Sequence, residues 1–221
     1  LNLYAERAYY YISTTAGNGE RILSFSQPSG TPAEIVETFE DVAYYEVDES
    51  SPSLVGRKWY GDRFDIETER AYGFELPNLI TNEPVNITVK AAAIADNQTS
   101  MNITLNGQNV TTFNMEATGD DMPSTTGASS TQVSVDQDSI TVGVNYDKNG
   151  NPAANAFLDY IRLEAKRQLK YEEGQLIFSY QKDNPQNDIV QFKITNASSV
   201  DQVWDISKWT DINSINNSQQ V

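Results

Sequence analysis

Apolar and polar residues alternate along much of this chain. Residues 85–93 (VNITVKAAA) carry their apolar side chains at odd-numbered positions, with Asn, Thr and Lys between the first of them. The runs 101–105 (MNITL), 139–146 (SITVGVNY) and 190–195 (VQFKIT) alternate in the same way. A period of two puts successive side chains on opposite faces of an extended chain. The pattern therefore predicts β-strands that each bury one face.

Turn residues separate these runs. Asn106-Gly107 stands between 101–105 and 108–115 (QNVTTFNM), which predicts a hairpin with a type I′ turn. Further turn signals are Asn18-Gly19, Pro77-Asn78, residues 149–152 (NGNP) and Asn184-Pro185. Strands that recur about every eight to twelve residues between such turns are typical of a β-sandwich or jelly roll.

The segment 157–169 (FLDYIRLEAKRQL) fits two periods. At helical spacing it has one apolar stripe, formed by Leu158, Ile161, Ala165 and Leu169. At strand spacing two faces separate: Ile161, Leu163 and Ala165 on one, Arg162, Glu164 and Lys166 on the other. Because the only other helical candidate is the short stretch 31–39 (TPAEIVETF), we favour a long strand. We expect it to continue into 175–180 (QLIFSY) after a turn at 172–174.

These patterns predict an all-β fold. We expect a jelly-roll-like β-sandwich over residues 51–170, with flanking strands in 1–50 and 171–221 that pack together as a second, small β unit. The stretch 116–132 is rich in Gly, Ser and Thr and is predicted to be a loop. The chain begins at Leu1, in what reads as a strand, without an initiator Met or a signal sequence. We therefore expect a piece of a longer protein.

The charge of the chain bears on its partners. The 221 residues include 15 basic and 31 acidic side chains, which gives a formal net charge of −16. Such a surface repels nucleic-acid phosphates and anionic membranes, so we expect no nucleic-acid partner. A run of about 18 to 20 apolar residues, which a membrane helix needs, does not occur in the sequence, and no membrane span is expected.

Cysteine and histidine do not occur in the sequence. Disulfides, thiolate nucleophiles, zinc–thiolate sites and histidine-dependent triads therefore have no residues to form from. Glycoside hydrolysis by two carboxyl groups remains open, and it needs two acidic side chains about 5 to 10 Å apart across a groove. Our expectation is that this chain is not itself an enzyme and holds no cofactor.

Pairs of acidic residues are the candidates for a metal site. Carboxylate oxygens suit Ca²⁺. The pairs do not have the spacing of an EF-hand loop, and in so acidic a chain we favour solvated surface over a calcium site. They are Asp48 with Glu49, Glu67 with Glu69, Asp120 with Asp121, and Asp136 with Asp138.

Aromatic residues are the candidates for ligand binding. Trp59 and Tyr60 are the ones we single out, because carbohydrate-binding sandwiches present such rings to sugars. Packing in the core is the alternative, since alternation buries half of any aromatic run. Trp204 and Trp209 are expected to anchor the last strand. Six Asn-x-Ser/Thr triplets would mark glycosylation in a eukaryotic secreted protein: those at Asn86, Asn97, Asn102, Asn109, Asn196 and Asn216. We interpret them as incidental, because those at Asn86 and Asn102 arise from polar alternation on outward strand faces.

Four stretches together resemble one protein family. They are residues 1–14 (LNLYAERAYYYIST), 56–64 (GRKWYGDRF), 157–169 and 203–209 (VWDISKW). In this order they are similar to the region that precedes the peptidase domain of the PorU-like, gingipain-related surface proteases of the Bacteroidota type IX secretion system. Leu3, Tyr60 and Asp62 stand where that family usually has Pro, Phe and Glu.

The resemblance implies a function for the whole parent protein. It implies an exported chain at the bacterial outer-membrane surface that continues into a cysteine-peptidase domain, which removes sorting signals from cargo and links the cargo to lipopolysaccharide. The family's catalytic Cys and His lie beyond this region. The resemblance therefore implies a non-catalytic accessory module that positions the peptidase domain and docks cargo or secretion partners. A carbohydrate-binding module that recognises a surface glycan is the main alternative.

Overall fold

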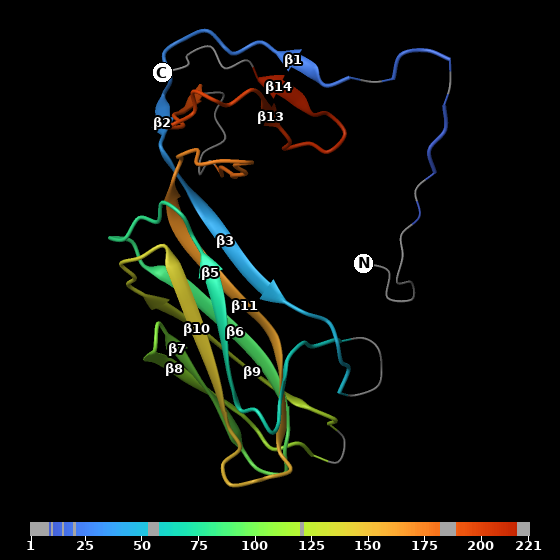
Figure 1. The fold of residues 1–221 in the computed structure, drawn as a ribbon, viewed down its shortest axis with the longest axis vertical. Coiled ribbons are helices and arrows are strands. Elements are labelled where there is room, and N and C mark those ends of the chain that lie inside the picture. The colour runs from blue at the N-terminus through green and yellow to red at the C-terminus, as the bar shows by residue number, and fades with distance from the viewer. Residues whose placement is uncertain are drawn as a thin grey trace. The chain divides into compact units, whose positions relative to one another are not determined.

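The computed structural model describes residues 9, 11–14, 16–19, 21–52, 58–119, 122–181 and 189–215. Every regular element in these ranges is a β-strand, which confirms the predicted all-β class (Figure 1). Most of the stretch 1–14, the pair Asp120 and Asp121, the turn at Asn184-Pro185 and Asn216 lie outside the described residues.

The chain divides into two compact units. One comprises Thr38–Gln168 and Ile177–Gln181, and the other Leu1–Glu37, Leu169–Leu176 and Lys182–Val221. The first unit contains the sandwich and begins before residue 51, because strand β3 (Thr38–Glu46) pairs antiparallel with β11 (Asn155–Gln168). Residues 38–46 therefore belong to the sandwich and not to the flanking strands, in contrast to the predicted start at residue 51.

Two antiparallel sheets form the sandwich. One has the order β3-β11-β6-β9, with β4 also paired to β11, and the other has the order β5-β10-β7-β8 (Figure 1). Their remaining strands are β4 (Arg63–Phe64), β5 (Glu69–Glu75), β6 (Val85–Ile94), β7 (Thr99–Leu105), β8 (Gln108–Met115), β9 (Thr125–Val133) and β10 (Ser139–Asp147). Strand β3 lies at one end of the first sheet and strand β5 at one end of the second, so both are edge strands.

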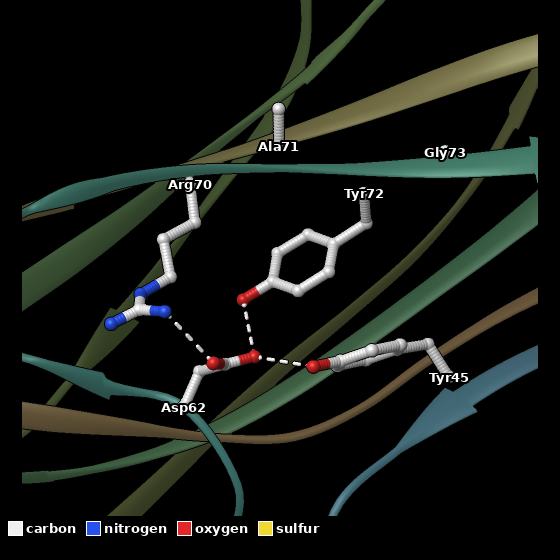
Figure 2. A pocket seen from close by; sticks show the side chains of 6 residues that line it. All are labelled: Tyr45, Asp62, Arg70, Ala71, Tyr72 and Gly73. Carbon is white, nitrogen blue, oxygen red and sulfur yellow. Dashed lines mark hydrogen bonds and ion pairs between the residues drawn. The ribbon is translucent and has the colours of Figure 1, made fainter.

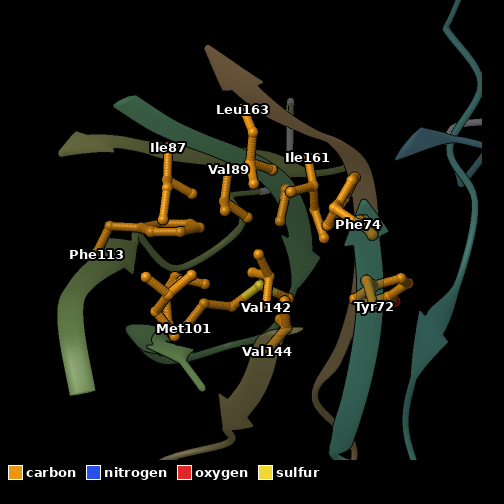
Figure 3. Close-up of a cluster of buried hydrophobic side chains, with 14 of the residues drawn as sticks. Tyr72, Phe74, Ile87, Val89, Met101, Phe113, Val142, Val144, Ile161 and Leu163 are labelled. Carbon is orange, nitrogen blue, oxygen red and sulfur yellow. The ribbon is translucent and has the colours of Figure 1, made fainter. Parts of the chain in front are cut away.

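The sandwich core lies between the inner faces of the two sheets. Ile87, Val89, Ile161 and Leu163 come from one sheet and meet Met101 and Val142 from the other (Figure 3). Their side chains are almost completely buried. Removal of this apolar surface from water is the main stabilising contribution, roughly 25 cal/mol per Å².

The segment 157–169 is a strand over most of its length, as predicted. Ile161, Leu163 and Ala165 are buried, whereas Arg162 and Glu164 are only partly covered. The register with β6 shifts between Leu158 and Tyr160, which marks a β-bulge. This bulge inserts Asp159 and changes which face the following side chains take.

The predicted hairpin at Asn106-Gly107 is also present. Both residues have positive φ, 48° and 83°, as a type I′ turn requires. Strands β7 and β8 pair on either side of it, starting with Leu105 opposite Gln108.

Two strand predictions were wrong. Residues 175–180 form no strand, and the stretch 116–132 is not all loop, because Thr125–Val133 is β9, paired with β6. Strand β9 consists mainly of small polar residues, so it has no hydrophobic alternation by which to recognise it. The free edge of β6 supplies its hydrogen bonds, which is a tertiary effect. The helical candidate 31–39 contains β2 (Glu34–Val36) and the start of β3.

The other unit contains two small sheets. Strands β1 (Leu23–Phe25), β14 (Asn213–Ile215) and β13 (Val203–Asp205) form one of them. β2 pairs with β12 (Val190–Phe192), which is shorter than the predicted strand 190–195. Trp204 lies in β13 and is about half exposed, whereas Trp209 is almost fully exposed.

Candidate functional site

Two of the stretches that carry the family resemblance lie side by side in the sandwich. Residues 58–64 run along the first half of β11: Gly61 N–H donates to the carbonyl of Leu158, and Leu158 N–H donates to the carbonyl of Asp62, both at 2.9 Å. Beyond them, Phe64 of β4 pairs with Ala156. The pairing of these two stretches gives both of them a structural role.

Gly61 is required where the 58–64 segment passes Val47. A Cβ atom at this position would lie 2.7 Å from the carbonyl oxygen of Val47 and 3.0 Å from its Cβ. Real Cβ atoms do not approach a backbone atom so closely. A glycine lets the two backbone segments pack against each other.

Asp62 organises a polar cluster where the edge strands of the two sheets meet (Figure 2). Its Oδ2 accepts hydrogen bonds from the hydroxyls of Tyr45 (2.7 Å) and Tyr72 (2.9 Å). Its Oδ1 accepts one from Nη1 of Arg70 at 2.9 Å, which is also an ion pair. Tyr45 comes from β3, and Arg70 and Tyr72 come from β5. The cluster therefore joins the two sheets through one carboxylate.

The two tyrosines are donors in this cluster. Burial, followed by the hydrogen bond to Asp62, raises the pKa of Tyr45 to about 12. The same two causes raise the pKa of Tyr72 above its ordinary value, while the charge of Arg70 lowers it slightly. Both hydroxyls are protonated at neutral pH, so they hold the carboxylate rather than act as bases.

A shallow hollow adjoins the cluster. It has a volume of about 470 Å³ and is lined by Tyr45, Asp62, Arg70, Tyr72 and the backbone strand at Ala71 and Gly73 (Figure 2). Both oxygens of Asp62 are already bound by protein donors. We interpret the cluster as structural, because it joins the edge strands of the two sheets.

The outer face of the β3-β11-β6-β9 sheet carries a second group of side chains. Tyr44 of β3 and Tyr160 of β11 stack on the face of the β3-β11-β6-β9 sheet that points away from the core, with ring centroids 5.4 Å apart and an interplanar angle of 26°. Tyr44 remains 49% exposed. Burial, followed by the charge of Glu46, raises the pKa of Tyr44 to about 12. Tyr44 is therefore the exposed ring of the pair, and Tyr160 is partly buried.

The bulge in β11 places a carboxylate beside this pair. The Asp159 side chain is only 7% exposed and forms ion pairs with Nζ of Lys58 (2.8 Å) and Nζ of Lys90 (3.4 Å). Burial by itself lowers the pKa of Lys58, whereas the hydrogen bond and the charge of Asp159 raise it, and the net pKa lies above its ordinary value. Lys58 is therefore charged near neutral pH.

The structure separates the two predicted binding residues. Tyr60 is 4% exposed and packs with Phe157 and Ala92, its ring centroid 6.5 Å from that of Phe157. Its ring faces protein and is not available as a platform. Trp59 is 37% exposed. Ligand binding by Trp59 stays a prediction.

Sequence reasoning missed the Tyr44–Tyr160 pair. The two residues are 116 positions apart and meet because Arg162 lies opposite Tyr44 and Tyr160 lies opposite Glu46 in the register of β3 and β11. The alternation of each strand shows that both side chains point outward. The register that brings them together is not visible in either strand alone.

The basic residues of β11 make ion pairs. Arg162 Nη2 lies 2.8 Å from Glu164 on the same strand, and Lys166 lies 3.8 Å from Glu83. Arg167 pairs with Asp41 across to β3. Arg162 and Glu164 thus pair within one strand, whereas Arg167 pairs across two strands.

Of the acidic residues proposed for Ca²⁺, Glu67 forms an ion pair with Arg70 of the Asp62 cluster at 3.5 Å. Asp48, Glu49, Glu67 and Glu69 are exposed. The exposed Asp138 accepts backbone hydrogen bonds from Asn78 (2.8 Å) and Leu79 (3.1 Å). Within the described ranges, no three Asp, Glu, His or Cys side chains gather as a metal site. In the same ranges, no helix could span a membrane.

Comparisons with known proteins place the fold. No protein-family model matches this sequence, and no curated protein matches it in sequence. Among solved structures, the chain is similar to dimeric latent PorU from Porphyromonas gingivalis, with a TM-score of 0.70 and 16% identity over 89% of this chain. The match covers 19% of the PorU chain, so the present chain spans about a fifth of it. The likeness shows a shared fold.

Other solved structures match over smaller parts of the chain. A carbohydrate-binding module, CBM36, in complex with calcium and xylotriose has a TM-score of 0.38 and 14% identity, over 58% of this chain and 99% of that one. The CBM36-1 domain of a multidomain xylanase from the hindgut metagenome of Trinervitermes trinervoides has a TM-score of 0.36 and 12% identity, over 56% of this chain and 95% of that one.

Proposed function

We propose that this chain is a non-catalytic β module of a larger, PorU-like cysteine peptidase exported to the bacterial cell surface. Its role is to position the peptidase domain and to dock cargo or proteins of the secretion machinery. The observation that carries the proposal is the PorU fold, which covers 89% of this chain and only 19% of that one. An accessory region is expected to match over most of its own length and over only a small part of the longer polypeptide.

The residues of the sandwich support an accessory role. The sequence has no Cys or His, so the nucleophile and base of a cysteine peptidase would have to come from elsewhere in the parent. The strongest polar cluster of the sandwich, at Asp62, uses both carboxylate oxygens to bind Tyr45, Tyr72 and Arg70. Such a network stiffens a scaffold.

Peptide cleavage tests this proposal. The 221-residue chain is incubated with a peptide that carries a carboxy-terminal sorting signal, and the products are followed by mass spectrometry. We expect no cleavage by this chain and cleavage by the full-length parent protein. Deletion of the module from the parent is expected to reduce the amount of cargo processed at the cell surface. Cleavage by the 221-residue chain alone would contradict a non-catalytic role.

Carbohydrate binding is the second candidate function. It is favoured by the stacked Tyr44–Tyr160 pair, in which Tyr44 is exposed, since aromatic faces are a common surface for sugar rings. Calorimetric titration with bacterial surface polysaccharides tests it. The variant Trp59→Ala shows whether the exposed Trp59 contributes, and heat release that is equal for both proteins would place the site elsewhere.

A further inference from the structure

The outer face of the β3-β11-β6-β9 sheet is covered only in part. Along the first half of β11, the segment around Tyr60 packs onto this face through Phe157 and Ala92. Beyond the bulge at Asp159, the face carries the stacked Tyr44 and Tyr160. We name the second part the tyrosine patch: Tyr44, Glu46, Lys58, Lys90, Asp159, Tyr160, Arg162 and Glu164.

The register of the strands shows which side chains surround the rings. Tyr160 lies opposite Glu46 on β3 and opposite Lys90 on β6. Tyr44 lies opposite Arg162 of β11. Side chains directly opposite in a pleated sheet are close neighbours. Each tyrosine therefore has a charged side chain next to its ring.

Charges within the patch balance. Lys58 and Lys90 share Asp159, and Arg162 pairs with Glu164. Glu46, which interacts with the Tyr44 hydroxyl, is the third carboxylate. Three positive and three negative groups give a locally neutral surface in a chain whose net charge is −16. The patch thus offers hydrogen-bond donors and acceptors without a net local charge.

The polar groups beside the patch have fixed orientations. Asn86 Nδ2 donates to Glu164 at 2.8 Å, and Ser130 Oγ donates to the Asn86 side-chain oxygen at 3.1 Å. Thr88 Oγ1 donates to Ser130 at 3.0 Å. Side chains that are already ordered lose little entropy when they bind a ligand.

We propose that the tyrosine patch binds a neutral oligosaccharide. The apolar face of a sugar ring packs on the aromatic pair at its exposed ring, Tyr44, while the sugar hydroxyls exchange hydrogen bonds with Lys90, Arg162 and Glu46. This inference rests on the second candidate function and names its site and its ligand class. Acidic glycans are disfavoured because the net charge of −16 repels them at long range.

A protein partner fits these observations less well. Centres of protein interfaces are enriched in apolar and aromatic side chains and depleted in charged ones. Here the rings are surrounded by three carboxylates and three cations, and the exposed Val42 of β3 is the apolar side chain that lies opposite Glu164. Aromatic faces framed by ordered polar groups match a ring with many hydroxyls better.

The test is isothermal titration calorimetry on the full 221-residue chain. Neutral probes are xylohexaose, cellohexaose and β-1,4-galactohexaose, and the acidic probe is trigalacturonic acid. The variants are Tyr44→Ala, Tyr160→Ala and Arg162→Ala. Thr141→Ala is the matched control, because Thr141 is exposed on the outward face of the other sheet. Urea unfolding of each variant verifies that it is folded.

We expect at least one neutral probe to bind, the acidic probe not to bind, and each tyrosine variant to weaken binding about tenfold. Arg162→Ala, which leaves the aromatic pair in place, is expected to weaken binding less, and Thr141→Ala is expected to bind as the unmodified chain does. Binding that survives both tyrosine substitutions, or that prefers trigalacturonic acid, would overturn the patch but leave carbohydrate binding in place. If no probe binds, the proposal for the patch is wrong, and the titration with bacterial surface polysaccharides decides the second candidate function separately.

Discussion

The two sheets of the sandwich bury similar side chains on the inside and differ on the outside. The outer face of β3-β11-β6-β9 carries the tyrosine patch with its ion pairs. The outer face of β5-β10-β7-β8 carries small or polar side chains, with rows such as Ala71, Gly143 and Thr104. Both inner faces contribute Val, Ile and Leu to one core.

The difference separates what holds the fold from what can recognise a ligand. Any β-sandwich needs two apolar inner faces, so the core says little about function. The outer faces are under no such requirement. An ordered aromatic and charged group on one face, opposite a plain polar face on the other, indicates which face to test first.

Removal of the buried carboxylate beside the patch should have the largest effect. Asp159→Ala leaves Lys58 and Lys90 near each other without their shared counter-ion. We expect a loss of about 3 kcal/mol in the free energy of unfolding, measured by urea titration. Thr141→Ala on the plain face should change it by less than about 1 kcal/mol. If both variants lost the same free energy of unfolding, the two outer faces would not differ in their contribution to stability.

Two glycines provide a comparison of backbone packing. Gly61→Ala places a Cβ 2.7 Å from the Val47 carbonyl oxygen, whereas Gly73→Ala on β5 meets open space. We expect a loss of about 2 kcal/mol for Gly61→Ala from overpacking, and no loss or a slight gain for Gly73→Ala. Thermal unfolding measured by circular dichroism decides. A tolerated Gly61→Ala would mean that the 58–64 segment can move away from Val47.

The cluster at the sandwich edge is tested by removal of one hydroxyl. Tyr45→Phe deletes the 2.7 Å hydrogen bond to Asp62 and keeps the aromatic ring. A hydrogen bond to a charged group contributes about 1.5 kcal/mol, and we expect a loss of this size in urea unfolding. Tyr11→Phe, at a tyrosine that is 97% exposed, is the control and should be neutral.

The smallest expected effect is a difference between Tyr45→Phe and the unmodified chain in how their stability depends on alkaline pH. Because the pKa values of Tyr45 and Tyr72 are raised in the folded state, Tyr45 to about 12, the folded chain binds their protons more tightly than the unfolded chain does. The stabilisation is complete below pH of about 10 and is lost as pH rises toward 12. The free energy of unfolding of Tyr45→Phe should fall less steeply with pH than that of the unmodified chain, and the two slopes should differ by about 1 kcal/mol or less per pH unit. Identical slopes would mean that Tyr45 is not held by Asp62.

The family resemblance could be read from short stretches, and their role could not. Residues 58–64 and 157–169 were recognised as motifs, but their mutual pairing through Leu158 appears only in the fold. Among the two aromatic candidates, Tyr60 proved to be a core residue because Phe157 and Ala92 cover it. An aromatic side chain on the outer face of a sheet is buried only if a distant segment packs over it. The local alternation of apolar and polar residues does not show whether such a segment is present.

The amino-acid sequence by itself determined the all-β class, the hairpin at Asn106-Gly107 and the inward face of β11, because alternation and turn chemistry act over a few neighbouring residues. Only the tertiary structure decided that Thr125–Val133 is a strand, that Asp159 lies in a bulge between two lysines, and that Tyr44 stacks on Tyr160. Each of these depends on strand register, which is fixed by the packing of both sheets against one core and not by any single strand.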